Sequence, residues 1–256
     1  MRVIINADDM GLSKDVNGSI ITLHQLGIVS STTLMANSPN FKQAVDLLSN
    51  HPDMGSGVHL CFYGPYQTST DYKTLIDPHT GSFYNNKEII KRIRESSVDK
   101  DEIFREFCLQ VEKVLDHGIR VSHLDTHHNL HLYFPVLSQI IRVARKYDIS
   151  FIRSQRLNTC IPKSRTNTLY RYIHQLYLNL RLQSVRGYFD PAMDDCPDYK
   201  FNLTRLEHML NSTKGIMEIM LHPLGEDDVE TRFFSSKEVL NLFNGHEIIN
   251  YNQLLR

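Results

Sequence analysis

The segment from residue 123 to residue 131 combines side chains that bind metal ions. It reads His-Leu-Asp-Thr-His-His-Asn-Leu-His, with four histidines and one aspartate in nine residues. Imidazole is the commonest metal ligand in proteins, and a carboxylate completes a nitrogen and oxygen site. Because side chains alternate along an extended segment, these histidines cannot all reach one ion. The segment therefore predicts one or two metal ligands, with its other histidines bound to neighbouring groups or to substrate. A solvated polar loop is the alternative interpretation.

Three further polar clusters follow short apolar runs. Asp8 and Asp9 come directly after the first run, and ionised carboxylates this close need a positive charge, a proton or a metal ion beside them. One of them would otherwise cap a helix while the other faces water. His59 and His222 also follow apolar runs, where a single histidine is more often a hydrogen-bonded structural residue. His222 is also a candidate general acid or base, since an unperturbed imidazole titrates near neutral pH.

Short β-branched runs alternate with segments of helical spacing. Strands are predicted at residues 3–6, 29–35, 57–60, 119–124, 149–152, 216–221 and 247–250. Helices are predicted at residues 13–26 (capped by Ser13), 41–48, 87–117 (broken near Ser96), 135–147, 166–182, 202–210 and 237–243. This alternation predicts an α/β fold, either a barrel or a doubly wound sheet. The carboxyl ends of parallel strands lie together, so we expect the polar clusters to converge.

Composition excludes several classes of protein. There are 28 Lys and Arg against 29 Asp and Glu, which argues against a nucleic-acid-binding surface. The 41% hydrophobic and 22% charged content is typical of a folded domain, and without linkers or repeats we expect one domain over residues 1–256. The cysteines are far apart, which favours a reducing compartment: Cys61, Cys108, Cys160 and Cys196. The first apolar run is too short for a signal peptide, and no run approaches a membrane span. We expect a cytoplasmic protein that binds no membrane.

Five motifs occur in a fixed order between residues 6 and 223. They are Asn6 to Gly11, Val29 to Thr33, Gly57 to Leu60, His123 to His128, and Leu221 to Pro223. In this order they resemble the YdjC-like carbohydrate deacetylase family, which includes chitooligosaccharide deacetylases. The paired aspartates and the histidine-rich motif together are specific, although neither is so alone. Met10 stands where an aromatic residue is usual in the family, and Asn129 interrupts a histidine run that is often longer.

The resemblance implies a distorted (β/α) TIM-like barrel that hydrolyses N-acetyl groups of amino sugars or oligosaccharides. It implies metal ligands at Asp9, His59 and His127. It also implies a base, an acid and a partner for that base at Asp8, His222 and Arg153. Family resemblance favours Mg²⁺ and a homodimer, whereas one aspartate and two histidines favour Zn²⁺ or another transition ion. The roles of four neighbouring residues stay open: His123, Asp125, His128 and His131.

Two other functions use similar residues. Another metal-dependent barrel enzyme, such as a phosphoesterase or a sugar isomerase, would also place aspartate and histidine at strand ends. The absence of a glycine-rich phosphate loop and the scarcity of Lys and Arg near the motifs disfavour a phosphate substrate. A non-catalytic metal- or sugar-binding protein would lack an acid–base pair beside the metal. The long loop at residues 64–86 is expected to bind substrate or cover it. Four aromatic residues in or before this loop would stack on a sugar or pack beneath the loop: Phe62, Tyr63, Tyr66 and Tyr72.

Overall fold

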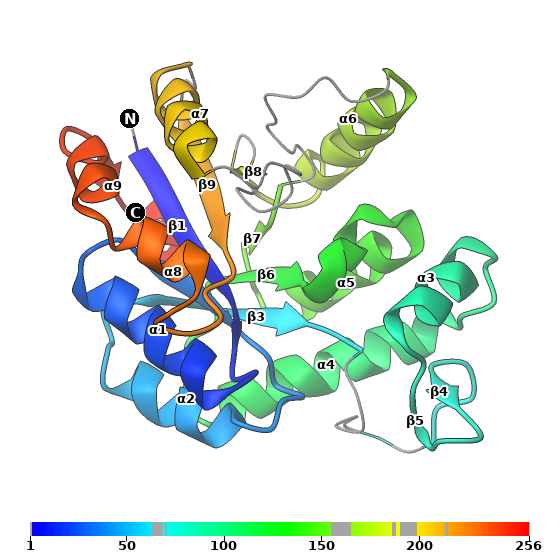
Figure 1. Cartoon of the computed structure of the whole chain (residues 1–256). Coiled ribbons are helices and arrows are strands. Elements are labelled where there is room, and N and C mark those ends of the chain that lie inside the picture. Colours follow the sequence, from blue (N-terminus) through cyan, green and yellow to red (C-terminus); the bar gives the residue numbers. More distant parts are fainter. Residues whose placement is uncertain are drawn as a thin grey trace.

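The computed structural model describes residues 2–62, 69, 71–154, 165–185, 188–189, 199–212 and 215–255. Figure 1 shows helices arranged around a group of central strands. The strands are β1 (Arg2–Met10), β2 (Ser31–Leu34), β3 (Gly55–Leu60), β4 (Ile76–Asp77), β5 (Ser82–Phe83), β6 (His123–Thr126), β7 (Phe151–Ile152), β8 (Tyr188–Phe189), β9 (Ile216–Leu221) and β10 (Glu247–Ile248). The helices are α1 (Lys14–Gln25), α2 (Phe41–Ser49), α3 (Asn86–Arg94), α4 (Lys100–Asp116), α5 (Phe134–Lys146), α6 (Arg165–Asn179), α7 (Tyr199–Ser212), α8 (Val229–Phe234) and α9 (Lys237–Leu242), with 3-10 helices η1 (His127–Leu132) and η3 (Tyr251–Leu255).

The main sheet is parallel, and its strands follow one another in the order β7-β6-β3-β2-β1-β9-β8. Strand β10 pairs with the beginning of β1, and β4 and β5 form a separate antiparallel pair. The predicted α/β class is therefore confirmed. Phe151 in β7 forms an isolated parallel bridge with Gln183, in the segment between α6 and β8. This arrangement is compatible with the predicted distorted barrel. Among the described residues, no helix has both the length and the apolar character needed to cross a bilayer.

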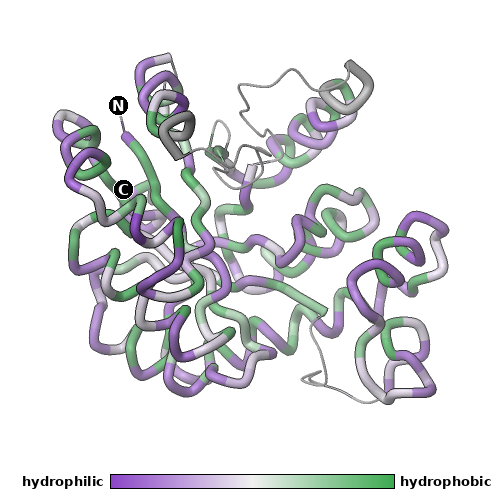
Figure 2. Tube along the Cα trace, in the orientation of Figure 1, coloured by the Kyte–Doolittle hydropathy of each residue, from purple (hydrophilic) through white to green (hydrophobic). Residues whose placement is uncertain are grey.

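Strands β2, β3, β6 and β7 are buried along their whole length, and β1 is buried after its first residue. Alternate residues of β1 pack into different clusters. Val3, Ile5 and Ala7 belong to the large core. Ile4 belongs to a second cluster with Phe151, Val185, Ile249 and Tyr251. Figure 2 shows hydrophobic stretches in β1 and β9, which give way to hydrophilic residues at the carboxyl end of β1, and helices of mixed polarity. Because side chains alternate along a strand, Asn6 and Asp8 share the face of Ile4 and point into the interior.

Strand β1 extends further than predicted. The sequence placed Asp8 and Asp9 in a loop, whereas the strand continues through Met10. Pairing with β2 shifts register between Ala7 and Met10, and Asp9 has a φ of 65°. An extra residue of this kind bends a strand and turns a side chain that would otherwise point away. Both carboxylates therefore reach the same end of the sheet.

The turn after β1 is held by hydrogen bonds from its backbone. Gly11 has a φ of 102°, which favours glycine, and its N–H donates to Asn17 Oδ1 at 2.6 Å. Leu12 N–H donates to the carbonyl of Asp9 at 2.9 Å. Ser13 caps α1, as predicted, by accepting from the N–H of Val16. These bonds fix the position of Asp9 relative to α1.

Other element boundaries also differ from the predictions. Strand β6 begins at His123 and includes Asp125, so it starts later than predicted and runs further. The predicted break in residues 87–117 is confirmed by α3 and α4. The β4–β5 pair lies within the predicted long loop, and α8 and β8 were not predicted.

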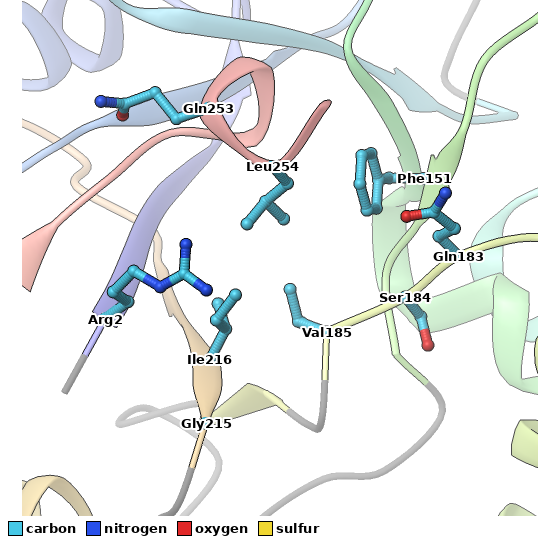
Figure 3. A pocket seen from close by; sticks show the side chains of 9 residues that line it. All are labelled: Arg2, Phe151, Gln183, Ser184, Val185, Gly215, Ile216, Gln253 and Leu254. Atoms are coloured by element: carbon cyan, nitrogen blue, oxygen red, sulfur yellow. The ribbon is translucent and has the colours of Figure 1, made fainter. Parts of the chain in front are cut away.

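A cavity of about 420 Å³ opens at the amino ends of β1 and β9 (Figure 3). Phe151, Val185, Ile216 and Leu254 supply its apolar walls, and Arg2 lies at its edge. Asp8 and Asp9 lie towards the carboxyl end of β1. The predicted polar site and this cavity therefore occupy opposite ends of the strands.

Gly57 in β3 provides the space for His123 in β6. A Cβ at residue 57 would lie 2.6 Å from Cε1 and 2.7 Å from the carbonyl oxygen of His123, so the two strands would have to separate. We predict that Gly57→Ala lowers the free energy of unfolding in urea by about 1–3 kcal/mol, the usual cost of overpacking a core. The control is Gly18→Ala in α1, where the added Cβ meets no atom within 4 Å. It should raise stability by roughly 0.5–1 kcal/mol. Equal effects of the two substitutions would contradict this packing.

Candidate functional site

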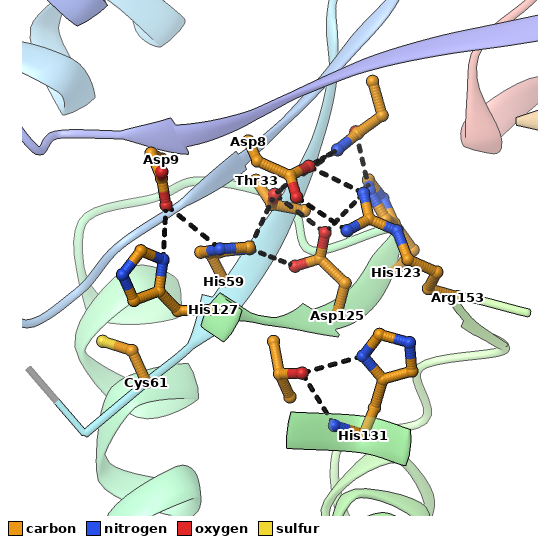
Figure 4. A network of polar contacts seen from close by, with 12 residues as sticks. Asp8, Asp9, Thr33, His59, Cys61, His123, Asp125, His127, His131 and Arg153 are labelled. Atoms are coloured by element: carbon orange, nitrogen blue, oxygen red, sulfur yellow. Dashed lines mark hydrogen bonds and ion pairs between the residues drawn. The ribbon is translucent and has the colours of Figure 1, made fainter. Parts of the chain in front are cut away.

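The structure brings together the three residues that the sequence suggested as metal ligands. Asp9 at the end of β1, His59 in β3 and His127 in η1 each offer an atom within 4.8 Å of the others. Asp9 Oδ1 lies 3.1 Å from His59 Nε2 and 2.8 Å from His127 Nδ1. Figure 4 shows both rings directed at this carboxylate. We call Asp9, His59 and His127 the ligand triad.

The ligand triad fits a cation. Asp9 Oδ1 is buried and makes no hydrogen bond of good geometry, although two ring nitrogens face it. Burial would raise the pKa of Asp9, but the adjacent His127 and His59 hold it well below its usual value, so the carboxylate is ionised. One carboxylate oxygen and two imidazole nitrogens therefore converge on one point, which matches the donor set of a zinc or similar transition-ion site.

Asp125 orients His59 within the ligand triad. Its Oδ1 lies 2.7 Å from His59 Nδ1, and Thr33 Oγ1 donates to its other oxygen at 3.0 Å. An Nδ1–H that donates to Asp125 leaves Nε2 free to face Asp9, as second carboxylates commonly arrange for metal-binding histidines. Burial would lower the pKa of His59, but Asp125 and Asp8 raise it well above its usual value. These surroundings therefore favour a positive charge, which a proton or a metal cation supplies.

A second group of possible ligand atoms comprises Asp8, His59 and Asp125. Both of its carboxylates already contact the guanidinium of Arg153, at 2.7 Å for Asp8 and 2.8 Å for Asp125. A metal cation among these atoms would be repelled by that guanidinium. The ligand triad is therefore the better candidate.

Arg153 lies at the centre of three buried carboxylates. Its Nη1 and Nη2 donate to the two oxygens of Asp8 at 2.7 Å each, a bidentate pair. Nη2 also contacts Asp125, and Nε and Nη2 donate to Glu218 Oε1 at 2.9 and 2.7 Å. Burial would raise the pKa of Asp8, but Arg153 holds it well below its usual value, so Asp8 is ionised. The structure thus pairs Arg153 with Asp8.

Glu218 was not identified from the sequence. It is fully buried in β9, within the otherwise apolar segment Ile216–Leu221. Burial raises its pKa, while Arg153 opposes that shift. A lone glutamate inside an apolar strand was the available signal, because buried carboxylates are rare unless they are paired.

His222 follows β9 and lies beside Asp8. Its Nε2 is 3.8 Å from Asp8 Oδ2, and its side chain is 32% exposed. Asp8, His222 and the ligand triad all line one pocket of about 250 Å³. The remaining lining residues are Thr126, His128, Asn129, Met220 and Leu224. The suggested base, acid and ligands therefore share one opening.

The four histidines of residues 123–131 point in different directions, as predicted, and only His127 joins the ligand triad. His128 and Asn129 both have φ near 54°, and this sharp turn lays the His128 ring against His127 with centroids 3.9 Å apart. Burial and the neighbouring His127 lower the pKa of His128 to about 4. His131 faces Thr126, at 2.8 Å from its hydroxyl, and His123 faces Asn6.

Two of the four aromatic residues named before and within the long loop, Phe62 and Tyr72, are packed inside. Phe62 stacks on Phe107 with centroids 5.2 Å apart, and the Tyr72 hydroxyl donates to Glu106 at 2.8 Å. Packing beneath the loop, rather than sugar stacking, therefore describes both.

Cys61 and Cys108 are free and buried. Four residues named from the sequence lie outside the described part of the chain: Tyr63, Tyr66, Cys160 and Cys196.

Comparison with known proteins adds an independent observation. Residues 2–251 match the model of a family described as YdjC-like protein. A relative named carbohydrate deacetylase from Halalkalibacterium halodurans is 38% identical over 149 residues, which cover 58% of this chain and only 62% of the relative. Another protein of the same name, from Vibrio cholerae, is 30% identical over 247 residues, which cover 88% of this chain and 93% of the relative. A solved structure from Enterococcus faecalis is described as a putative cellobiose-phosphate cleavage protein. Its TM-score is 0.81 and its sequence identity 25%, and the match covers 99% of this chain and 98% of that protein.

The charge on Arg153 should contribute strongly to the stability of the fold. We predict that Arg153→Ala lowers the free energy of unfolding in urea by about 3–5 kcal/mol, because it leaves buried carboxylates without their cation. The control, Arg105→Ala, removes an exposed pair with Asp71 at 2.9 Å and should cost no more than about 1 kcal/mol. Similar losses in the two variants would show that the buried carboxylates do not depend on Arg153.

Proposed function

We propose that this chain, which belongs to the YdjC-like family, is a metal-dependent hydrolase that removes N-acetyl groups from amino sugars. One observation carries this proposal. The ligand triad shares its pocket with an ionised carboxylate, Asp8, and a partly exposed imidazole, His222. Hydrolysis of an amide needs an activated water molecule and a proton donor for the leaving nitrogen. The names of the similar bacterial proteins support the same activity.

Asp9, His59 and His127 would hold a divalent ion. When bound, such an ion polarises the acetyl carbonyl and makes water more acidic. The mixed nitrogen and oxygen ligands favour Zn²⁺ or another transition ion, since Mg²⁺ prefers oxygen ligands. Mg²⁺ remains the alternative that the family resemblance suggests.

Asp8 acts as the proton acceptor in this proposal. Arg153 holds both of its oxygens, which keeps the carboxylate ionised and fixes its direction. The same contact makes Asp8 a weak base, so its contribution depends on position rather than on high basicity. His222, 3.8 Å from Asp8, would donate a proton to the departing nitrogen.

The size and lining of the pocket favour a small acetylated sugar. Its volume of about 250 Å³ lies below the roughly 300–1,000 Å³ of typical ligand pockets. It would therefore admit the acetamido end of a sugar rather than a whole oligosaccharide. Chitooligosaccharide-type substrates such as N,N'-diacetylchitobiose meet this requirement. A homodimer stays an expectation from the family resemblance, and a cytoplasmic location stays a prediction from the sequence.

The two alternatives predict different surroundings. The Enterococcus faecalis protein is described as acting on a phosphorylated sugar, cellobiose phosphate. A phosphorylated substrate needs cationic groups, but the described lining of the pocket contains neither lysine nor arginine. The guanidinium of Arg153 is engaged by three carboxylates. A non-catalytic binding protein would have no reason to place Asp8 and His222 beside the ligand triad. Deacetylation is therefore the function that the geometry supports best.

Metal removal tests the proposed activity. We expect the chain to release acetate from N,N'-diacetylchitobiose. Acetate release should stop after treatment with EDTA, and Zn²⁺ or Co²⁺ should restore it better than Mg²⁺ does. Asp9→Ala and His127→Ala should each abolish stoichiometric metal measured by elemental analysis. His128→Ala, one residue along the same turn, should keep it. Acetate release that persists in EDTA, or metal retained by both triad variants, would contradict the proposal.

Asp8→Asn should separate catalysis from metal binding. The amide keeps the shape of the side chain but cannot accept the proton, so kcat should fall by about 10²–10⁴-fold. Metal content should stay at the wild-type level, because Asp8 is not in the ligand triad. Full turnover by a metal-loaded Asp8→Asn variant would rule out Asp8 as the base.

A further inference from the structure

Asp8 belongs to a closed ring of buried side chains beneath the pocket. We call this set the buried ring. Its members, each 0–1% exposed and each in contact with the next, are Asp8, Arg153, Glu218, Tyr251, His123 and Asn6. The ring joins residues from β1, β6, β9, η3 and the segment after β7.

One side of the buried ring is a chain of charged hydrogen bonds. The Tyr251 hydroxyl donates to Glu218 Oε2 at 2.7 Å. The other oxygen, Oε1, accepts from Arg153 Nε and Nη2 at 2.9 and 2.7 Å. Arg153 in turn donates to both oxygens of Asp8. Each donor therefore fixes the group that orients the next.

The other side of the buried ring reaches Asp8 without charge. The Tyr251 ring stacks on His123, with centroids 3.8 Å apart and planes 16° from parallel. His123 Nε2 lies 3.0 Å from Asn6 Oδ1, and Asn6 Nδ2 donates to Asp8 Oδ1 at 2.9 Å. A carbonyl oxygen only accepts, so Nε2 carries a proton. The Phe151 ring also contacts Tyr251, with centroids 5.8 Å apart.

We propose that Tyr251 is a positioning residue of the Asp8 site, acting through Glu218 and Arg153. Its sequence position, 243 residues after Asp8, gives no sign of this role. Without the hydroxyl, Glu218 Oε2 would be a buried carboxylate oxygen lacking its donor. Glu218 would then attract the Arg153 guanidinium more strongly, and the bidentate contact between Arg153 and Asp8 would shift. A misplaced catalytic group lowers turnover even where binding is intact. The role in turnover rests on the proposed deacetylase function.

A kinetic double-mutant cycle tests the proposal. Tyr251→Phe removes only the hydroxyl and keeps the stack on His123. With saturating metal and N,N'-diacetylchitobiose, Tyr251→Phe and Glu218→Gln should each lower kcat by about tenfold, as outer partners of a site commonly do, with KM changed by less than about threefold. The double variant should be no slower than Glu218→Gln alone, because both act through one unit. Tyr147→Phe, which removes a hydroxyl bonded to Glu112 away from the site, should keep wild-type kcat.

A second cycle needs no activity. In urea unfolding of the metal-free chain, the effect of Tyr251→Phe on the unfolding constant should differ at least about twofold between the wild-type and Asp8→Asn backgrounds. Full additivity would overturn the linkage. Wild-type kcat in Tyr251→Phe, or multiplicative losses in the kinetic double variant, would overturn the role in turnover. If the wild-type chain releases no acetate, the proposed function fails and the unfolding cycle alone decides the linkage.

Discussion

Three carboxylates buried around a single guanidinium form the interaction on which this site depends. Asp8, Asp125 and Glu218 all contact Arg153, and all four side chains are essentially inaccessible to water. Burying a charge is costly unless partners compensate it. One guanidinium cannot neutralise three ionised carboxylates. His59 lies beside this cluster, and Asp125 and Asp8 raise its pKa well above the usual value, so its surroundings favour a second positive charge there.

This charge balance links the interior of the fold to the metal-binding end. Asp125 contacts Arg153 with one oxygen and His59 with the other, so it joins the Arg153 cluster to the ligand triad. The bulge in β1 places Asp8 on the Arg153 side and Asp9 on the side of the histidines. Two adjacent carboxylates therefore face different groups, a guanidinium for Asp8 and two imidazoles for Asp9. That division of labour explains how paired aspartates are tolerated at the end of a buried strand.

The sequence motifs predicted the residues of the site more accurately than the boundaries of the strands around it. The alternation of apolar runs and helical segments predicted the α/β class, and it predicted that the polar clusters converge because carboxyl ends of parallel strands meet. The choice of Asp9, His59 and His127 within those clusters came from the family resemblance. The extension of β1 through Met10 was missed, since a bulge depends on pairing with β2 rather than on local residue type. Glu218 and Tyr251 were missed for the same reason. Their partners are contributed by distant strands, and neither residue lies in a recognisable motif.

The most direct measurement is an anomalous diffraction map of crystals grown with Zn²⁺ or Co²⁺, collected at the absorption edge of the metal. The account predicts one strong peak at about 2.0–2.2 Å from Asp9 Oδ1, His59 Nε2 and His127 Nδ1, with Arg153 still bound to both oxygens of Asp8. A peak between Asp8 and Asp125, or an ordered metal ion bound elsewhere while the ligand triad holds none, would contradict it.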